Sequence, residues 1–127
     1  MGRVSRGVLL AWSVAAFACQ AATPVPTDKL NYVGLWVAER EYVSIFSRGY
    51  LEYRKKLAGG LHDLSRGNVK FEADRLVLFF TDFRVDDPPA LHDDGKWWMT
   101  LDGVRYRKVG PPVEYGKSSN WPPQLAD

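Results

Sequence analysis

The sequence has almost no cysteine, because Cys19 is the only one among 127 residues. A single thiol excludes an intramolecular disulfide, so a hydrophobic core must hold the fold. A membrane-spanning run is also missing, since the apolar stretch from Gly7 to Ala18 is too short to cross a bilayer. No segment of about ten or more residues has helical periodicity. These absences exclude a disulfide-stapled miniprotein, a transmembrane helix and a helical bundle.

The predicted mature chain also has no excess of positive or negative charge. Arg3 and Arg6 precede the apolar stretch, and residues 16–18 (Ala-Phe-Ala) have the small-x-small pattern of a signal-peptide cleavage site. Removing residues 1–18 lowers the 17 basic residues by these two and leaves 15 of each sign. A balanced mature chain gives no electrostatic reason to expect nucleic acid or an anionic membrane as partner.

Cys19 lies at the expected cleavage point, between residues 18 and 22, and two fates stay open for it. Cleavage near Ala21 or Ala22 would remove the thiol. Alternatively, residues 16–19 (Ala-Phe-Ala-Cys) resemble the lipobox of bacterial lipoproteins, which implies acylation of Cys19 and attachment to the outer membrane. Either fate predicts an exported bacterial protein of the periplasm or the outer membrane.

The length left after cleavage suits one small domain with a single core. We expect a tether over residues 19–30, a β-domain over 31–109 and a Pro-, Gly- and Ser-rich tail over 110–127. Pro24 and Pro26 argue against a helix in the tether. Alternation of apolar and polar residues predicts strands over 32–39, 41–45, 50–57, 69–73, 75–85, 97–101 and 104–108.

Two segments between these strands are expected to be irregular. Residues 61–66 are bracketed by glycines and predict a loop or a single helical turn. Residues 86–95 predict an acidic loop stiffened by Pro88 and Pro89. All eight prolines then lie outside the predicted strands, as proline's missing N–H group requires in a sheet.

Residues 95–109 predict the most specific local structure. Asp102-Gly103 is a strong signal for a type I′ hairpin turn, which fixes the register of the flanking strands. The predicted pairs are Leu101 with Val104, Met99 with Tyr106, Trp97 with Lys108, Thr100 with Arg105, and Trp98 with Arg107. One face of the hairpin is therefore apolar, and the other is basic and aromatic.

The fold class that follows is all-β, an antiparallel meander of six to seven short strands. So few strands leave exposed edges unless the sheet curls into a small barrel or half-barrel. Residues 34–36 (Gly-Leu-Trp) resemble the Gly-x-Trp signature of lipocalins, in which the Trp closes the barrel floor beneath a basic residue of a late strand. The resemblance implies a lipocalin-like barrel, with Arg105 or Arg107 in that basic role.

A second resemblance covers residues 83–109. A Val-x-x-Pro-Pro segment, an acidic Gly loop, a Trp-x-Met run and an Asp-Gly-Val hairpin follow one another there. The segment is similar to a recurring ending of short exported bacterial proteins. The similarity implies the same fold and compartment and no particular activity.

Two sets of ionisable residues contain side chains of the kinds that bind metal ions or catalyse hydrolysis. Asp86, Asp87, His92, Asp93 and Asp94 supply oxygen and imidazole ligands that hold metal ions, although their spacing matches no EF-hand and a solvated loop is favoured. The second set contains His62, Asp63 and Ser65 and the carboxylates Glu39, Glu41 and Glu52. It lacks a Gly-x-Ser-x-Gly elbow, and nothing in the sequence brings its members together.

The aromatic residues give the functional prediction. Trp98, Tyr115 and Trp121 do not fit the core by periodicity, so they either line a ligand mouth, dock a partner, or fold the tail back onto the sheet. Trp98, Arg105, Arg107 and Trp121 are the candidate ligand- or partner-binding residues. We expect a non-catalytic envelope domain, without a cofactor, that binds a protein partner or an apolar small molecule. The alternative is a metal-dependent or hydrolase-like enzyme that uses the acidic loop 86–94.

Overall fold

The computed structural model describes residues 23–79 and 81–125. The predicted export signal and Cys19 lie outside these ranges. Within them, no helix has the length and apolar character needed to cross a membrane.

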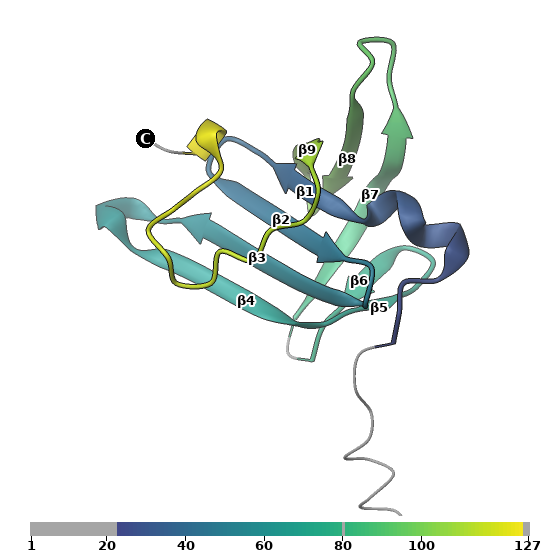
Figure 1. Cartoon of the computed structure of the whole chain (residues 1–127), viewed down its shortest axis with the longest axis horizontal. Coiled ribbons are helices and arrows are strands. Elements are labelled where there is room, and N and C mark those ends of the chain that lie inside the picture. The colour runs from purple at the N-terminus through teal and green to yellow at the C-terminus, as the bar shows by residue number, and fades with distance from the viewer. Residues whose placement is uncertain (1–22, 80, 126–127) are drawn as a thin grey trace, which may run out of the picture.

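Nine antiparallel strands and three 3-10 helices make up the described chain (Figure 1). The helices are η1 (Thr27–Tyr32), η2 (Ala58–Gly60) and η3 (Pro123–Leu125). The strands are β1 (Gly34–Val37), β2 (Glu41–Phe46), β3 (Tyr50–Lys56), β4 (His62–Asn68), β5 (Lys70–Phe71), β6 (Arg75–Val77), β7 (Asp82–Leu91), β8 (Trp97–Leu101) and β9 (Val104–Gly110). The prediction of an all-β antiparallel meander is thus confirmed, with more strands than expected.

The strands form one sheet that curls into a nearly closed barrel. Its order is β4-β3-β2-β1-β9-β8-β7-β6-β5, and it wraps through 262°. Every neighbouring pair is consecutive in the chain except β1 and β9, whose antiparallel pairing joins the first strand to the last. The two edge strands, β4 and β5, are separated only by Val69, whose N–H group donates to the Gly49 carbonyl at 2.9 Å. The chain itself therefore crosses the seam of the barrel.

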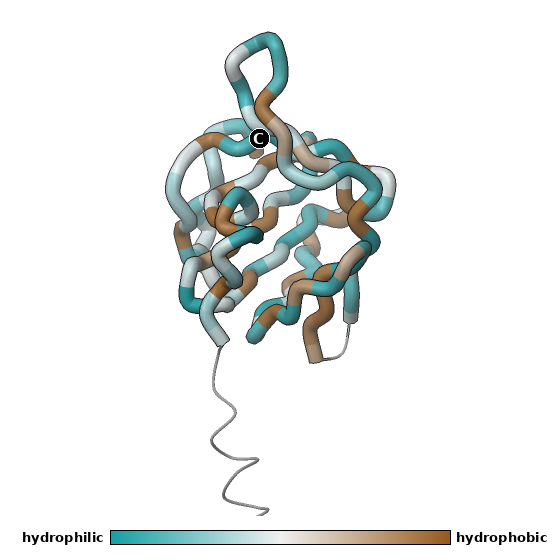
Figure 2. Tube along the Cα trace, turned by 90° about the vertical axis from the view of Figure 1, so that its right-hand side faces the viewer, coloured by the Kyte–Doolittle hydropathy of each residue, from teal (hydrophilic) through white to brown (hydrophobic). Residues whose placement is uncertain are grey.

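The barrel interior is filled by side chains. One cluster of buried apolar residues forms this core, and Figure 2 shows hydrophobic positions, in brown, recurring along the strands around it. Trp36, Ile45 and Tyr106 are among its fully or almost fully buried members. Because these large side chains occupy the centre, the fold resembles a packed small barrel rather than an open ligand cup.

Trp36 lies in β1, beside η1. Its indole N–H group donates to the Tyr32 carbonyl at 2.8 Å, and the Lys108 ammonium lies 5.0 Å from the centre of its ring. A basic residue of the last strand therefore covers this Trp, but it is Lys108 rather than Arg105 or Arg107. Alternation along β9 explains the difference, because Lys108 and Tyr106 share the inner face while the two arginines point outward.

The Asp102-Gly103 hairpin is confirmed. Both turn residues have positive φ, 49° at Asp102 and 78° at Gly103, as a type I′ turn requires. The register pairs Leu101 with Val104, Met99 with Tyr106, Thr100 with Arg105 and Trp98 with Arg107, as predicted. Asp86 of β7 accepts a hydrogen bond from the Gly103 N–H group at 2.6 Å and so ties the turn to the neighbouring strand.

Three predictions about the segments before this hairpin are wrong. Residues 62–68 form β4 instead of a loop, because they pair along the whole of β3 although they lack apolar alternation. The long strand predicted over 75–85 is two strands, β6 and β7, separated by a turn in which Leu78 N–H donates to the Thr81 carbonyl. The tether, in turn, contains η1 despite its prolines.

The acidic segment is also more regular than predicted. Strand β7 continues through Leu91 and includes Pro88 and Pro89, so not all prolines lie outside strands. Beyond Arg84, β7 pairs with β8 alone, and the ladder there has two register shifts. An edge with bulges tolerates proline because its missing N–H group leaves no ladder bond unmade.

Candidate functional site

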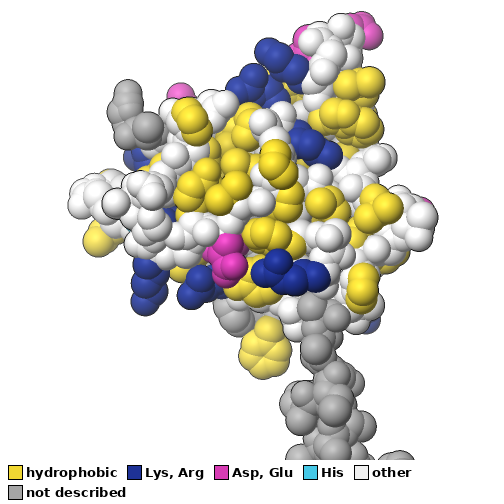
Figure 3. All heavy atoms as spheres, viewed as in Figure 1, with side chains coloured by type: hydrophobic (Ala, Val, Ile, Leu, Met, Phe, Trp, Pro, Cys, Tyr) yellow, Lys and Arg dark blue, Asp and Glu magenta, His cyan; other side chains and the backbone are white. Residues whose placement is uncertain are grey.

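The C-terminal tail, residues 111–125, covers the outer face of the first strands. It runs from β9 across β2 and β3 toward β4 and then turns back to η3 (Figure 1). Figure 3, in the same view, shows hydrophobic side chains gathered over the middle of this face. A second apolar cluster lies beneath it and consists of Leu35, Val37, Tyr42 and Leu125 with Val109, Tyr115 and Trp121. Tyr115 and Trp121 of the tail therefore pack onto the sheet.

Glu52 of β3 fastens the tail to the sheet. Its side chain is fully buried, and its carboxylate accepts hydrogen bonds from the Tyr42 hydroxyl at 2.7 Å and from the N–H groups of Tyr115 and Gly116 at 2.8 and 3.0 Å. Burial, followed by this carboxylate, raises the pKa of Tyr42 well above its ordinary value. Glu52 is buried on the outer face of the sheet because the tail covers it there.

Arg54, two residues further along β3, holds the next part of the tail. Its guanidinium donates to the carbonyls of Gly116 and Ser118 at 2.8 and 2.7 Å. It also lies 4.1 Å from the centre of the Trp121 ring and 2.6 Å from Nδ1 of His62. Because a guanidinium only donates, Nδ1 is the acceptor, and the neutral His62 ring carries its proton on Nε2.

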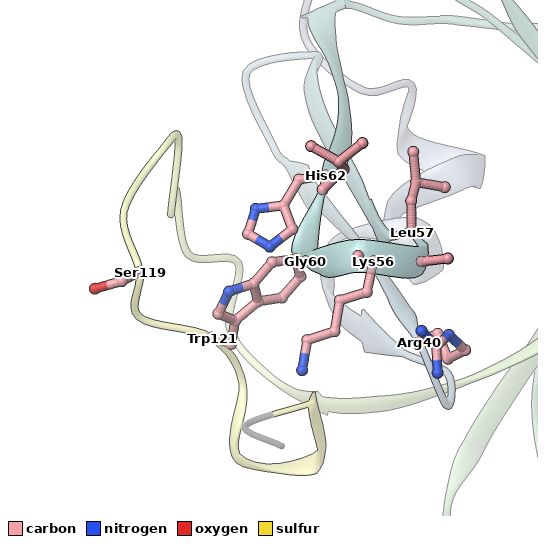
Figure 4. Close-up of a pocket in the computed structure, with 10 residues that line it drawn as sticks. Arg40, Lys56, Leu57, Gly60, His62, Ser119 and Trp121 are labelled. Carbon is pink, nitrogen blue, oxygen red and sulfur yellow. The ribbon is translucent and has the colours of Figure 1, made fainter.

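A pocket of about 460 Å³ opens where the tail meets the β3–β4 turn (Figure 4). Its lining includes Arg40, Lys56, Leu57, Leu61, His62 and Trp121. The centres of the His62 and Trp121 rings are 4.6 Å apart, and the ring planes are inclined by 78° in an edge-to-face contact. In Figure 4 the Lys56 side chain extends toward Trp121. The turn itself is built by Gly59 and Gly60, which have positive φ and place no side chain in the opening.

The side chains that line the pocket carry a net positive charge. None of its lining residues in the described chain is acidic, and neither Arg40 nor Lys56 forms an ion pair there. Desolvation, followed by the charges of Arg54 and Lys56, lowers the pKa of His62. The pocket thus combines positive charge with an aromatic ring and two exposed leucines.

A second carboxylate, Glu41, lies on the opposite face of the sheet. It accepts hydrogen bonds from the hydroxyls of Tyr106 at 2.7 Å and Tyr53 at 3.0 Å inside one end of the barrel. Burial raises the pKa of both tyrosines, followed by the Glu41 charge for Tyr53 and by the hydrogen bond to Glu41 for Tyr106. Because Glu41 and Glu52 lie on opposite faces, the structure does not pair them for acid–base chemistry.

The predicted binding residues fall into two groups. Trp121 lines the pocket, whereas Trp98, Arg105 and Arg107 lie on the outer face of the β8–β9 hairpin. The Arg105 guanidinium lies 3.9 Å from the centre of the Trp98 ring, and the Trp98 indole donates to Asp94 at 3.0 Å. Trp98 therefore stacks with its diagonal neighbour Arg105 rather than with Arg107, its partner in register.

The acidic residues of the predicted metal loop are spread along an arm formed by β7 and β8. Asp86 contacts Arg84 and Gly103 at the base, and Asp94 accepts from Lys96 and Trp98 at the tip. In the described chain no three His, Cys, Asp or Glu residues are placed to hold a metal ion. Asp87 and Ala90 pair with β8, while His92 and Asp93 follow the end of β7.

Arg40, Lys56 and Leu61 were not among the predicted site residues. Trp121 was, but its contacts come from residues more than fifty positions earlier in the chain, which periodicity does not reveal. The one local signal was the Gly59-Gly60 turn flanked by two leucines. Apolar residues beside a glycine turn leave an exposed apolar surface that the adjoining strands do not cover.

The fold and the pocket define a small β-barrel-like protein with a cationic, partly apolar surface site. The chain matches no family model, and it has no significant match among curated proteins or solved structures.

Proposed function

We propose that this protein is a non-catalytic, lipocalin-like domain of the bacterial cell envelope that binds a small molecule with an apolar body. The pocket between the tail and the β3–β4 turn carries this proposal. Its volume of about 460 Å³ lies in the range of small-molecule sites. The barrel interior is filled by the core, so the ligand binds on the outside of the sheet and not within it.

Apolar surface at the rim supports this function. Leu61 is 66% exposed and Leu57 is 39% exposed, and both line the pocket beside Trp121. Exposed leucines around an opening stabilise a bound apolar group by withdrawing from water. The lipocalin-like character adds support through Gly34 and Trp36, with a 3-10 helix before them and Lys108 above the indole.

Titration with N-phenyl-1-naphthylamine tests the proposal, because this neutral dye becomes fluorescent when it leaves water. We expect saturable binding that Leu61→Gln weakens about fivefold or more, since the variant replaces apolar contact surface. Leu91→Gln is the matched control, because Leu91 is 59% exposed on the arm, away from the pocket. Absence of saturable binding, or equal weakening by both variants, would overturn the proposed function.

The envelope location rests on the export pattern of the N-terminus. Mass spectrometry of the mature protein from its native host is expected to show a chain that begins between Cys19 and Thr23, with or without a lipid on Cys19. A mature chain that still begins with Met1 would contradict the location and leave the pocket proposal standing.

A further inference from the structure

We propose that the pocket selects a small molecule that carries an anionic acid group, a carboxylate or a sulfonate, beside its apolar body. This inference rests on the proposed function and names the ligand class of the same site. The cationic residues of the pocket, and the groups that hold them in place, carry it.

The two cationic side chains come from neighbouring turns of the sheet. Arg40 lies between β1 and β2, and Lys56 ends β3. The Lys56 N–H group donates to the Arg40 carbonyl at 2.9 Å, which fixes the two backbones side by side. Both residues line the pocket, and Figure 4 shows the Lys56 side chain directed toward Trp121.

These charges are not neutralised within the described chain. Several other cations have carboxylate partners, as in the pair of Arg75 with Asp82 at 3.1 Å. Arg40 and Lys56 have none, although Lys56 lies 5.1 Å from the centre of the Trp121 ring. Two unpaired cations beside a partly desolvated surface attract an anion more strongly than they would in open water.

His62 adds a hydrogen-bond donor to the same wall. Its Nδ1 accepts from Arg54, so the remaining N–H group at Nε2 has no acceptor among the bonds of the described chain. A carboxylate or sulfonate oxygen accepts such a bond, whereas an ammonium group cannot. The leucines and Trp121 then contact the apolar body, so one ligand satisfies both parts of the pocket.

A pair of dyes distinguishes the contribution of the acid group to the binding affinity from that of the apolar body. 8-Anilinonaphthalene-1-sulfonate is N-phenyl-1-naphthylamine with one added sulfonate, so the two share an apolar body. We expect the wild-type protein to bind the sulfonate about tenfold more tightly than the neutral dye. The double variant Arg40→Gln with Lys56→Gln is expected to lose this preference and keep its affinity for the neutral dye.

Lys55→Gln is the matched control, because Lys55 is exposed on the same strand and does not line the pocket. It is expected to keep the preference. Equal affinities for the two dyes in the wild type, or a preference that survives in the double variant, would overturn the acid-group inference. Binding of the neutral dye that depends on Leu61 would then still support the proposed function, and loss of that binding would remove both.

Discussion

Hydrogen bonds stabilise the buried carboxylate of one residue, Glu52. An isolated carboxylate in a low-dielectric interior is strongly disfavoured unless hydrogen bonds replace its lost water. Glu52 receives such bonds from the Tyr42 hydroxyl and from two backbone N–H groups of the tail. The carboxylate therefore requires the tail, and the tail is held in one position by the carboxylate.

Glu52→Gln is expected to destabilise the protein by about 2 to 4 kcal/mol, because the amide nitrogen cannot accept the bonds that a carboxylate oxygen accepts. Denaturant unfolding measures the loss, and faster tryptic cleavage after Lys117 would show that the tail detaches first. Glu114→Gln is the control. Its ion pairs with Arg48 and Arg66 are 3.9 and 4.0 Å long and exposed, so its effect should stay below about 1 kcal/mol. Equal losses in both variants would contradict the role given to Glu52.

The lowered pKa of His62 makes stability depend on pH in a defined direction. Above the ordinary histidine pKa of about 6.5 the ring is neutral in both the folded and the unfolded chain. As the pH falls below that value, the unfolded chain takes up a proton that the folded chain resists, so the free energy of unfolding decreases.

We therefore expect the melting temperature to fall between about pH 7.5 and 5.5, and to fall less in His62→Gln. His92→Gln is the control, because Nδ1 of His92 lies 3.5 Å from a guanidinium nitrogen, compared with 2.6 Å for His62. A pH profile that His62→Gln leaves unchanged would contradict the prediction.

At the scale of single elements, the β8–β9 hairpin depends on its turn. Gly103 has φ of 78°, and a β-branched residue is strained there even though nothing lies within 4 Å of an added Cβ. Gly103→Val is expected to cost about 1 to 3 kcal/mol in denaturant unfolding. Gly110→Val makes the same change in equally open space without positive φ. If the two variants unfold alike, backbone strain is not what the turn glycine avoids.

The elements that the sequence predicted correctly are those whose signals are local. Asp102-Gly103 determines its own turn and, through it, the register of β8 and β9. Strand β4 was missed because its polar residues pair with β3 without packing against the core. The continuation of β7 through Pro88 and Pro89 was missed because whether a proline is tolerated depends on which strands lie beside it.

At the scale of the whole molecule, composition and alternation predicted an all-β barrel-like fold, but not the position of the tail. Both faces of β1 are covered, because Trp36 lies in the barrel core while Leu35 and Val37 pack in the cluster under the tail. That Glu52 and Arg54 bind the tail depends on contacts between β3 and residues more than sixty positions away. The pocket therefore also depends on these distant contacts, because the tail forms one of its walls.

The pairing of β1 with β9 also determines when the fold can be completed. Trp36 lies opposite Lys108, so one edge of the first strand has no partner until nearly the whole chain is present. Closing so long a loop costs conformational entropy before any contact compensates it. Folding is therefore expected to be slow, in the millisecond-to-second range of β-proteins with distant contacts. During synthesis the chain remains an incomplete sheet, and only arrival of the last strand converts it into a cooperative unit.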